Sequence, residues 1–137
     1  IDQEIIRKAL KTIRVPGRVE VIDNDRGYLL LIDYAHNAMS LKNIQETMRR
    51  YHPRQLWVLF GCGGGRSAAR RREMGCVAGK YADFTVITSD NPRYEEPERI
   101  MQTIEEGMKE TKGQYQMMVY AGTGTAGRYF DPGGKGP

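Results

Sequence analysis

The chain has 137 residues, of which 39% are hydrophobic and 28% are charged, and its formal net charge is +4. This length suits a single domain, and the share of apolar residues excludes an intrinsically disordered chain. No apolar run approaches the roughly 18 residues of a membrane-spanning helix, so we expect a cytoplasmic protein without membrane contact. The small net charge does not by itself indicate nucleic acid, and two cysteines without CxxC spacing are expected to be free thiols.

The first third of the chain is expected to contain a helix and a β-hairpin. Residues 1–14 begin with apolar side chains at helical spacing, and the pattern breaks at Pro16-Gly17. We interpret this segment as the end of a preceding domain or a linker helix, and residues 15–120 as the main domain. The segments 19–22 and 28–33 are rich in strand formers and flank a turn of Asp, Asn and Gly residues, which predicts a hairpin.

Helices and strands alternate after the hairpin. Helices are predicted to begin with Ser40 as an N-cap, at about residue 69, and at Pro97. Strands are predicted over 56–60, 84–88 and 116–120, and the first has the continuous apolar run of a central strand buried on both faces. This order predicts an α/β fold, with a Rossmann-like, mostly parallel sheet, helices on both faces and an N-terminal hairpin. Residues 121–137 form a Gly-rich tail that we expect to be loop-like or disordered.

Three polar segments follow the predicted strands, at 33–37, 61–72 and 89–93. Ligands of an open parallel sheet bind outside the carboxyl ends of its strands. We therefore expect these three segments to converge on one edge of the sheet, and their side chains are the candidates for binding.

The Gly-rich segment can bind an anion. Gly61-Cys62-Gly63-Gly64-Gly65 brings backbone N–H groups to a helix N-terminus, and arginines follow at positions 66, 70, 71 and 72, opposed locally only by Glu73. The GxxxxGK[ST] pattern of a P-loop is absent. The alternative is a tight turn followed by a solvated basic helix face, and the residues alone leave both interpretations open.

The other two segments hold complementary polar groups. Asp33 suits ribose hydroxyls or the water shell of magnesium, and His36 can bond a base or a phosphate, although Asp and Asn also cap helices. The segment Asp90-Asn91-Pro92-Arg93 fits an amino-acid zwitterion, because an aspartate accepts from an ammonium and an arginine binds a carboxylate with two bonds. The alternative is a turn whose arginine pairs with Glu95 or Glu96.

The order of these motifs resembles the C-terminal domain of the Mur ligases. The motifs are Val15-Pro16-Gly17-Arg18, Asp33-Tyr34-Ala35-His36-Asn37, Phe60-Gly61-Cys62-Gly63-Gly64 with Arg66, and Asp90-Asn91-Pro92-Arg93 followed by Glu95-Glu96-Pro97. The resemblance covers about residues 5–112, and the Asp-Asn-Pro-Arg form is similar to that of the diaminopimelate-adding members.

The resemblance implies a domain that binds an amino acid and closes over ATP in a ligase that adds meso-diaminopimelate to UDP-N-acetylmuramoyl-dipeptide in peptidoglycan synthesis. A carboxylate would be activated as an acyl phosphate and then attacked by the amine. ATP and Mg²⁺ would serve the full-length enzyme, while this domain alone would bind neither and would be inactive. Its partners would be diaminopimelate and the enzyme's own N-terminal and central domains, with no nucleic acid and no membrane.

The resemblance also implies the roles of individual residues. The ATP contacts would be Arg18 at the phosphates, Asp33 at the ribose, and His36 and Asn37 near the nucleotide. The residues that bind diaminopimelate would be Arg66, Asp90, Asn91, Pro92 and Arg93. No catalytic residue and no metal ligand are expected within this chain.

The chain departs from the family pattern in two places. The family has an acidic residue and a lysine where this chain has Gly65 and Ala68, and the later Gly-Lys-Gly-His-Glu motif has no counterpart. One alternative is a related ligase domain of the folylpolyglutamate or cyanophycin synthetase type. The other is a non-catalytic module that uses the arginine cluster to bind anions or nucleic acid.

Overall fold

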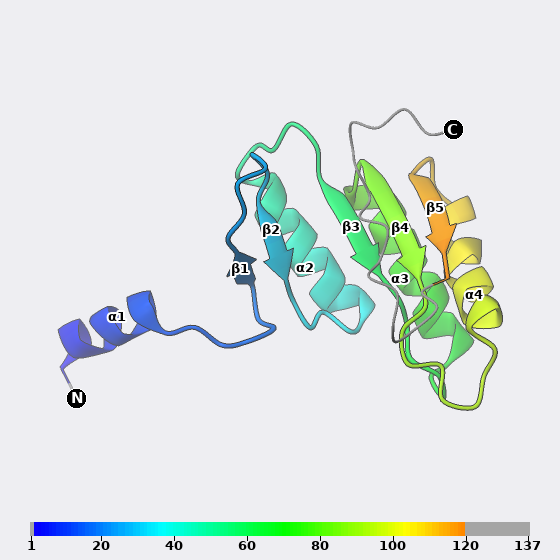
Figure 1. Ribbon diagram of the computed structural model, residues 1–137, viewed down its shortest axis with the longest axis horizontal. Coiled ribbons are helices and arrows are strands. Elements are labelled where there is room, and N and C mark those ends of the chain that lie inside the picture. Colours follow the sequence, from blue (N-terminus) through cyan, green and yellow to red (C-terminus); the bar gives the residue numbers. More distant parts are fainter. Residues whose placement is uncertain (1, 120–137) are drawn as a thin grey trace.

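The structure, a computed structural model, describes residues 2–119 (Figure 1). The helices are α1 (Gln3–Thr12), α2 (Ala38–Arg49), α3 (Ala68–Tyr81) and α4 (Pro97–Lys109), and the strands are β1 (Glu20–Ile22), β2 (Leu30–Ile32), β3 (Trp57–Phe60), β4 (Phe84–Thr88) and β5 (Gln114–Met118). The strands β1 and β2 form the predicted antiparallel hairpin, with Val21 opposite Leu31. The predicted tail, 121–137, lies outside the described residues.

The strand β4 is the centre of a parallel sheet in the order β3-β4-β5. Its residues Thr85, Val86 and Ile87 are buried, whereas Leu59 of β3 is 70% exposed. The prediction that residues 56–60 form a central strand buried on both faces is therefore wrong. The physical reason is that β3 pairs with β4 alone among the described strands, and every second side chain of β3 points to the open face of the sheet.

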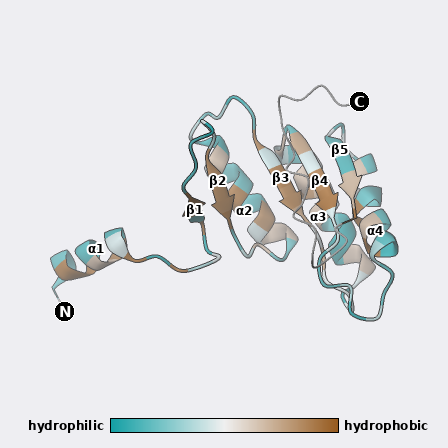
Figure 2. Cartoon of the chain, viewed as in Figure 1, coloured by the Kyte–Doolittle hydropathy of each residue, from teal (hydrophilic) through white to brown (hydrophobic). Residues whose placement is uncertain are grey.

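One layer of helices covers the other face of this sheet. Buried side chains of α2, α3 and α4 pack together with Ile87 and with the half-buried Val58 and Phe60, and Figure 1 shows these helices behind the strands. In Figure 2, β2, β3 and β4 are largely hydrophobic, whereas β5 and the helices mix hydrophilic and hydrophobic residues. The predicted α/β fold with a parallel sheet and an N-terminal hairpin is confirmed. Within residues 2–119, the helices that pack on the sheet, α2, α3 and α4, all lie on one face of it.

Two glycines let α3 and α4 approach each other closely. A Cβ atom on Gly75 would lie 2.1 Å from the carbonyl oxygen of Ile104, and one on Gly107 would lie 1.9 Å from the carbonyl oxygen of Arg72. Both distances are far below van der Waals contact, so any side chain at these positions would separate the helices. This close packing keeps the arginines of α3 within reach of the carboxylates on and beside α4.

The helix α2 begins earlier than predicted. Its N-cap is Asn37, whose side-chain oxygen accepts a hydrogen bond of 2.9 Å from the backbone N–H of Ser40. The prediction that Ser40 is the cap is wrong, because Asn37 has the extended backbone of a cap and Ser40 already lies in the first helical turn. The pair forms a standard N-terminal cap, which ties the end of the polar segment 33–37 to the helix.

The helix α1 stands apart from the sheet in Figure 1 and contributes no buried side chain. The predicted helix in segment 1–14 is confirmed, while its assignment to a preceding domain or linker stays a prediction. Leu10 and Ile13 are more than half exposed on and beside this helix. No helix in the described part of the chain has the length and apolar character needed to cross a bilayer.

Candidate ligand-binding site at the strand ends

The three polar segments gather at one edge of the molecule, as predicted. Figure 1 shows β2, β3 and β4 ending on the same side, where segments 33–37, 61–67 and 89–96 begin. We call residues 61–67 the glycine loop and residues 89–96 the asparagine loop. Together they contain all five residues that the resemblance assigns to diaminopimelate.

The glycine loop and the asparagine loop are joined backbone to backbone. The N–H of Gly64 donates a hydrogen bond of 2.8 Å to the carbonyl oxygen of Asn91. A Cβ atom on Gly64 would lie 1.9 Å from the carbonyl oxygen of Pro92, and one on Gly61 would lie 2.5 Å from that of Thr88. Glycine is therefore required here because the two backbones touch. The expected anion-binding turn is, in this structure, first of all a contact between two loops.

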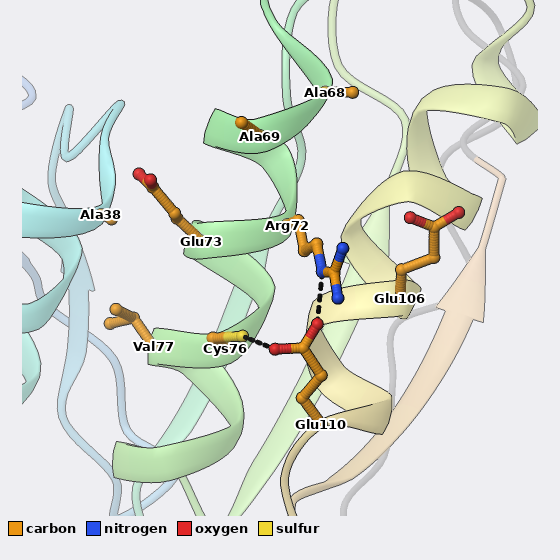
Figure 3. A pocket seen from close by; sticks show the side chains of 9 residues that line it. All are labelled: Ala38, Ala68, Ala69, Arg72, Glu73, Cys76, Val77, Glu106 and Glu110. Atoms are coloured by element: carbon orange, nitrogen blue, oxygen red, sulfur yellow. Dashed lines mark hydrogen bonds and ion pairs between the residues drawn. The ribbon is translucent and has the colours of Figure 1, made fainter.

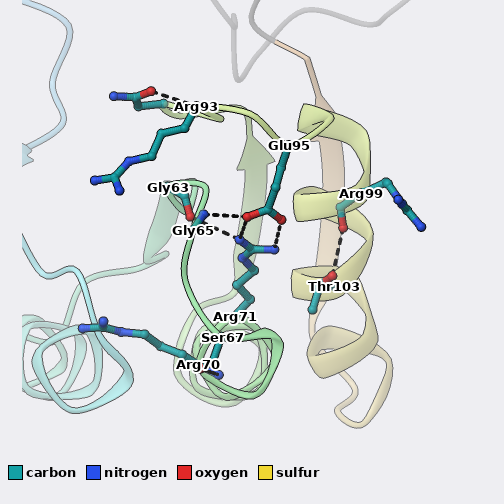
Figure 4. Close-up of polar contacts among 10 residues, drawn as sticks. Gly63, Gly65, Ser67, Arg70, Arg71, Arg93, Glu95, Arg99 and Thr103 are labelled. Atoms are coloured by element: carbon teal, nitrogen blue, oxygen red, sulfur yellow. Dashed lines mark hydrogen bonds and ion pairs between the residues drawn. The ribbon is translucent and has the colours of Figure 1, made fainter.

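An ion pair between a buried arginine and a partly exposed glutamate connects the two loops (Figure 4). The Nη1 and Nη2 atoms of Arg71 each donate a hydrogen bond of 2.8 Å to the carboxylate of Glu95. The same carboxylate accepts a bond of 2.6 Å from the backbone N–H of Gly65. The side chain of Arg71 is only 5% exposed. These hydrogen bonds, from Arg71 first and then from Gly65, lower the pKa of Glu95 to about 2.

Half of the arginine cluster is paired with carboxylates. Arg72 forms an ion pair with Glu110, the residue after α4, so two of the four arginines pair with carboxylates from a distant part of the sequence. The interpretation of a solvated basic face opposed only by Glu73 is wrong for these two residues, because the segments just before and just after α4 bring Glu95 and Glu110 against α3. Arg66 is exposed and has no ion pair among the described residues.

Arg93 keeps its charged group free in the described structure. The alternative of a pair with Glu95 or Glu96 does not occur, since the Glu95 carboxylate is occupied by Arg71. The backbone N–H of Arg93 donates a hydrogen bond of 3.3 Å to the side-chain oxygen of Asn91. The φ angle of Arg93, 55°, lies in the left-handed region. Figure 4 shows its side chain extending away from Glu95. An exposed guanidinium on a constrained backbone is suited to bind a carboxylate.

The other predicted binding residues share this exposure. Asp90 and Asn91 are exposed at the start of the asparagine loop, and Pro92 is half-buried, its carbonyl oxygen accepting 3.0 Å from the N–H of Glu95. The structure thus presents a carboxylate, an amide and a guanidinium at the surface of one loop. The inner contacts of that loop are made by Glu95, which the sequence interpretation did not assign to the site.

The segment 33–37 forms a second cluster around Asp33. One carboxylate oxygen of Asp33 accepts a hydrogen bond of 2.9 Å from the backbone N–H of Val19, and the other accepts one of 2.9 Å from the backbone N–H of Ala35. The guanidinium of Arg18 lies 4.7 Å from the centre of the Tyr34 ring, and the His36 ring lies 4.8 Å from that of Tyr34. Sequence reasoning missed Tyr34, although its place between Asp33 and His36 in the motif was the available indication.

This second cluster fits an anionic, aromatic ligand better than a metal ion. Arg18 and His36 are exposed, and each oxygen of Asp33 retains a lone pair beyond its one backbone hydrogen bond. The oxygen of Asn37, in contrast, is used as the cap of α2, so its free amide N–H groups would make any nucleotide contact. In residues 2–119, no group of three or more His, Cys, Asp and Glu side chains is arranged to hold a metal ion.

A hollow between α2, α3 and α4 lies away from both clusters (Figure 3). It is lined by Ala38, Ala68, Ala69, Arg72, Glu73, Cys76, Val77, Glu106 and Glu110. The thiol of Cys76 donates 3.3 Å to Glu110 there, and burial raises its pKa. The second thiol, Cys62, is buried against Met74 and its pKa is raised to about 11 by burial. Both thiols are free, as predicted, and neither is activated as a nucleophile.

An α/β domain that exposes charged side chains on loops at the carboxyl ends of its parallel strands has the design of a ligand-binding domain. Residues 17–125 match the family model described as Mur ligase, glutamate ligase domain. Since this match spans most of the chain, the chain belongs to the Mur ligase family, at its glutamate ligase domain, and the resemblance seen in the motifs is confirmed.

Two curated relatives and one solved structure carry the same ligase name. A UDP-N-acetylmuramoyl-L-alanyl-D-glutamate–2,6-diaminopimelate ligase from Alkaliphilus oremlandii is 44% identical over 117 residues, which cover 85% of this chain and 24% of the relative. The protein of that name from Aquifex aeolicus is 43% identical over 110 residues, covering 80% and 23%. A solved structure of such a ligase has 34% identity and a TM-score of 0.69, and the likeness covers 87% of this chain and 24% of that one. The chain spans about a quarter of the length of the curated relatives it matches.

Proposed function

We propose that the chain acts as the C-terminal domain of an ATP-dependent ligase that adds meso-diaminopimelate to UDP-N-acetylmuramoyl-dipeptide in peptidoglycan synthesis. The names of the relatives support this activity, and one observation in the structure carries the proposal. Arg66 and Arg93, which have no ion pairs within residues 2–119, stand on two loops that are fixed to each other. The exposed Asp90 and Asn91 lie on the same loop as Arg93. Such a set binds a ligand with both carboxylate and ammonium groups.

The chemistry of diaminopimelate matches this set of side chains. The molecule carries an ammonium and a carboxylate at each end, so the end that does not react needs partners of both signs. Arg93 binds the far carboxylate with two hydrogen bonds, and Asp90 and Asn91 accept from the far ammonium. Lysine lacks that carboxylate, and its binding gains nothing from Arg93. The domain thereby holds the second amine in place for attack on the acyl phosphate.

The cluster around Asp33 contacts the nucleotide in this proposal. Arg18 approaches the phosphates, Asp33 accepts from the ribose hydroxyls, and His36 and Asn37 lie near the nucleotide. When ATP is bound, it supplies the phosphoryl group that activates the carboxylate. Mg²⁺ and the activation step are assigned in this proposal to other domains of the ligase. The domain alone is proposed to be inactive and to work in the cytoplasm with those domains.

Calorimetric titration of this chain tests the proposal. We expect heat with meso-diaminopimelate, weaker or no binding of L-lysine, and no salt-sensitive binding of a short oligonucleotide. The variant Arg93→Ala is expected to weaken diaminopimelate binding by about 1.5–3 kcal/mol, the value of a charged hydrogen bond. The matched control is Arg99→Ala, since Arg99 extends to the opposite side of Glu95 in Figure 4.

Two outcomes would contradict the proposal. No heat with diaminopimelate, together with oligonucleotide binding that weakens with salt, would support the anion-binding module instead. An Arg93→Ala variant that binds as tightly as the unaltered chain would remove the assigned role of the asparagine loop. The pairing of Arg71 and Arg72 with carboxylates already weakens the case for nucleic acid, because fewer free cations remain on this surface.

A further inference from the structure

We propose that the ion pair between Arg71 and Glu95 has a positioning role. It fixes the glycine loop and the asparagine loop at the relative position that binding of diaminopimelate requires. The inference rests on the proposed function of these loops and adds two residues that the motif resemblance does not assign to the ligand. Neither residue touches the ligand in this proposal. They act by fixing the separation of the residues that do.

The pair is connected to both loops at once. Glu95 is part of the asparagine loop, and its Oε1 atom accepts 2.6 Å from the N–H of Gly65 in the glycine loop and 2.8 Å from Nη2 of Arg71. Arg71 in turn donates from Nη2 to the carbonyl oxygen of Gly63 at 3.4 Å. One carboxylate and one guanidinium therefore hold the two loops and the first turns of α3 together.

The locked positions are sequence neighbours of the binding residues. Arg66 follows Gly65 directly, and Arg93 lies two residues before Glu95. The hydrogen bonds to Glu95 thereby fix the backbone positions from which the side chains of Arg66 and Arg93 extend. A ligand with charges at two ends is sensitive to such a separation, since each misplaced contact loses most of its strength.

Burial makes the pair unsuitable as a direct ligand contact. The side chain of Arg71 is 5% exposed, and both Glu95 oxygens are engaged. A substrate carboxylate could reach Arg71 only by displacing Glu95. Removing the charge of Glu95, in contrast, leaves the buried guanidinium of Arg71 uncompensated, so the surrounding loops must rearrange to bring water or another acceptor to it.

Calorimetry and amide NMR on the unaltered chain, Glu95→Gln and Glu110→Gln test the inference. The control breaks the arginine–glutamate pair that the neighbouring Arg72 of α3 forms with Glu110, the residue after α4, away from the loops. We expect Glu95→Gln to raise the Kd for meso-diaminopimelate by about 10-fold to 100-fold, as loss of a supporting contact does at other sites. The amide proton of Gly65 should lose the downfield shift of a charge-assisted hydrogen bond. Glu110→Gln should change neither quantity.

Selectivity separates a positioning role from a general loss of structure. Loss of the correct loop positions should weaken the binding of meso-diaminopimelate more than the binding of L-lysine. Partial unfolding, in contrast, lowers both affinities in proportion. The variant Arg71→Lys provides a second approach if Glu95→Gln does not fold, because it keeps the positive charge but cannot form the bidentate hydrogen bonds to Glu95. It is expected to bind diaminopimelate with an affinity between those of Glu95→Gln and the unaltered chain.

The outcomes distinguish this inference from the proposed function. If the unaltered chain binds no diaminopimelate, the proposed function fails and the inference fails with it. If the unaltered chain binds and a folded Glu95→Gln or Arg71→Lys variant has the same Kd and selectivity, the inference alone is overturned. Equal weakening in Glu110→Gln would also overturn it, since the effect would then belong to helix packing in general.

Discussion

Asp33 accepts a hydrogen bond of 2.9 Å from the backbone N–H of Val19, 14 residues earlier in the chain. Val19 has a φ of 47°, which is a strained conformation for a β-branched residue. The bond from Asp33 helps to hold this conformation and ties the entry of the hairpin to the turn before α2. It also fixes the backbone next to Arg18, whose guanidinium stacks on Tyr34.

The variant Asp33→Ala is therefore expected to lower the free energy of unfolding. Both oxygens of Asp33 bind backbone N–H groups, and loss of these bonds should cost about 1–3 kcal/mol, measured by urea denaturation. The matched control is Asp25→Ala in the exposed hairpin turn, which should change stability by less than about 0.5 kcal/mol. Equal stability of the two variants would show that the Asp33 bonds do not hold the hairpin.

A second prediction concerns the contact between the loops. A Cβ atom on Gly64 would overlap the carbonyl oxygen of Pro92 at 1.9 Å, while one on Gly63 would be 3.6 Å from its nearest neighbour, the carbonyl oxygen of Asn91. Gly64→Ala should cost about 1–3 kcal/mol of stability and weaken diaminopimelate binding, whereas Gly63→Ala should be tolerated. Thermal unfolding and calorimetry on the two variants measure the difference. Similar behaviour of both would contradict the loop contact.

The sequence predicted the elements and the edge on which the motifs meet, because both depend on local patterns. Apolar periodicity located the helices and strands. Asp33 follows β2 of the antiparallel hairpin and Asp90 follows β4 of the parallel sheet, and the two strands end on the same side (Figure 1). The choice of Ser40 over Asn37 as the cap of α2 failed because both residue types cap helices and stand three residues apart. Local composition could not decide between them.

The inner part of the site could not be predicted in the same way. Arg71 and Glu95 are 24 residues apart, and only the close approach of α3 to α4 brings them together. The sequence near Arg71 offered Glu73 as its nearest acidic residue, which suggested a free basic face. The exposure of Leu59 was equally hidden, since an apolar run does not reveal how many neighbours a strand has in its sheet.

The two thiols provide a third prediction. The pKa of Cys62 is raised to about 11 by burial, so at pH 8 only about one molecule in a thousand carries the reactive thiolate. A disulfide reagent should therefore modify Cys62 slowly in the folded chain and rapidly in urea. The half-buried Cys76, which is more accessible to the reagent than the buried Cys62, should react first, and Cys76→Ser should remove the fast phase. A fast phase that persists in Cys76→Ser would contradict the burial of Cys62.

The last prediction concerns pH. The pKa of Glu95 is lowered from 4.5 to about 2, so the folded chain favours the ionised carboxylate more than the unfolded chain does. The stability contributed by this group is fully present above pH 4.5 and is lost as the pH falls through about 2.

Glu95→Gln cannot make this contribution at any pH. The difference in unfolding free energy between the unaltered chain and Glu95→Gln should thus be largest above pH 4.5 and should shrink toward pH 2, measured by urea denaturation at pH 7, 4.5, 3 and 2. The control Glu98→Gln alters an exposed glutamate of α4 without an ion pair among the described residues, and it accounts for the general effect of replacing a glutamate. A constant difference between Glu95→Gln and the unaltered chain across this range would mean that the Glu95 carboxylate does not depend on Arg71 for its ionised state.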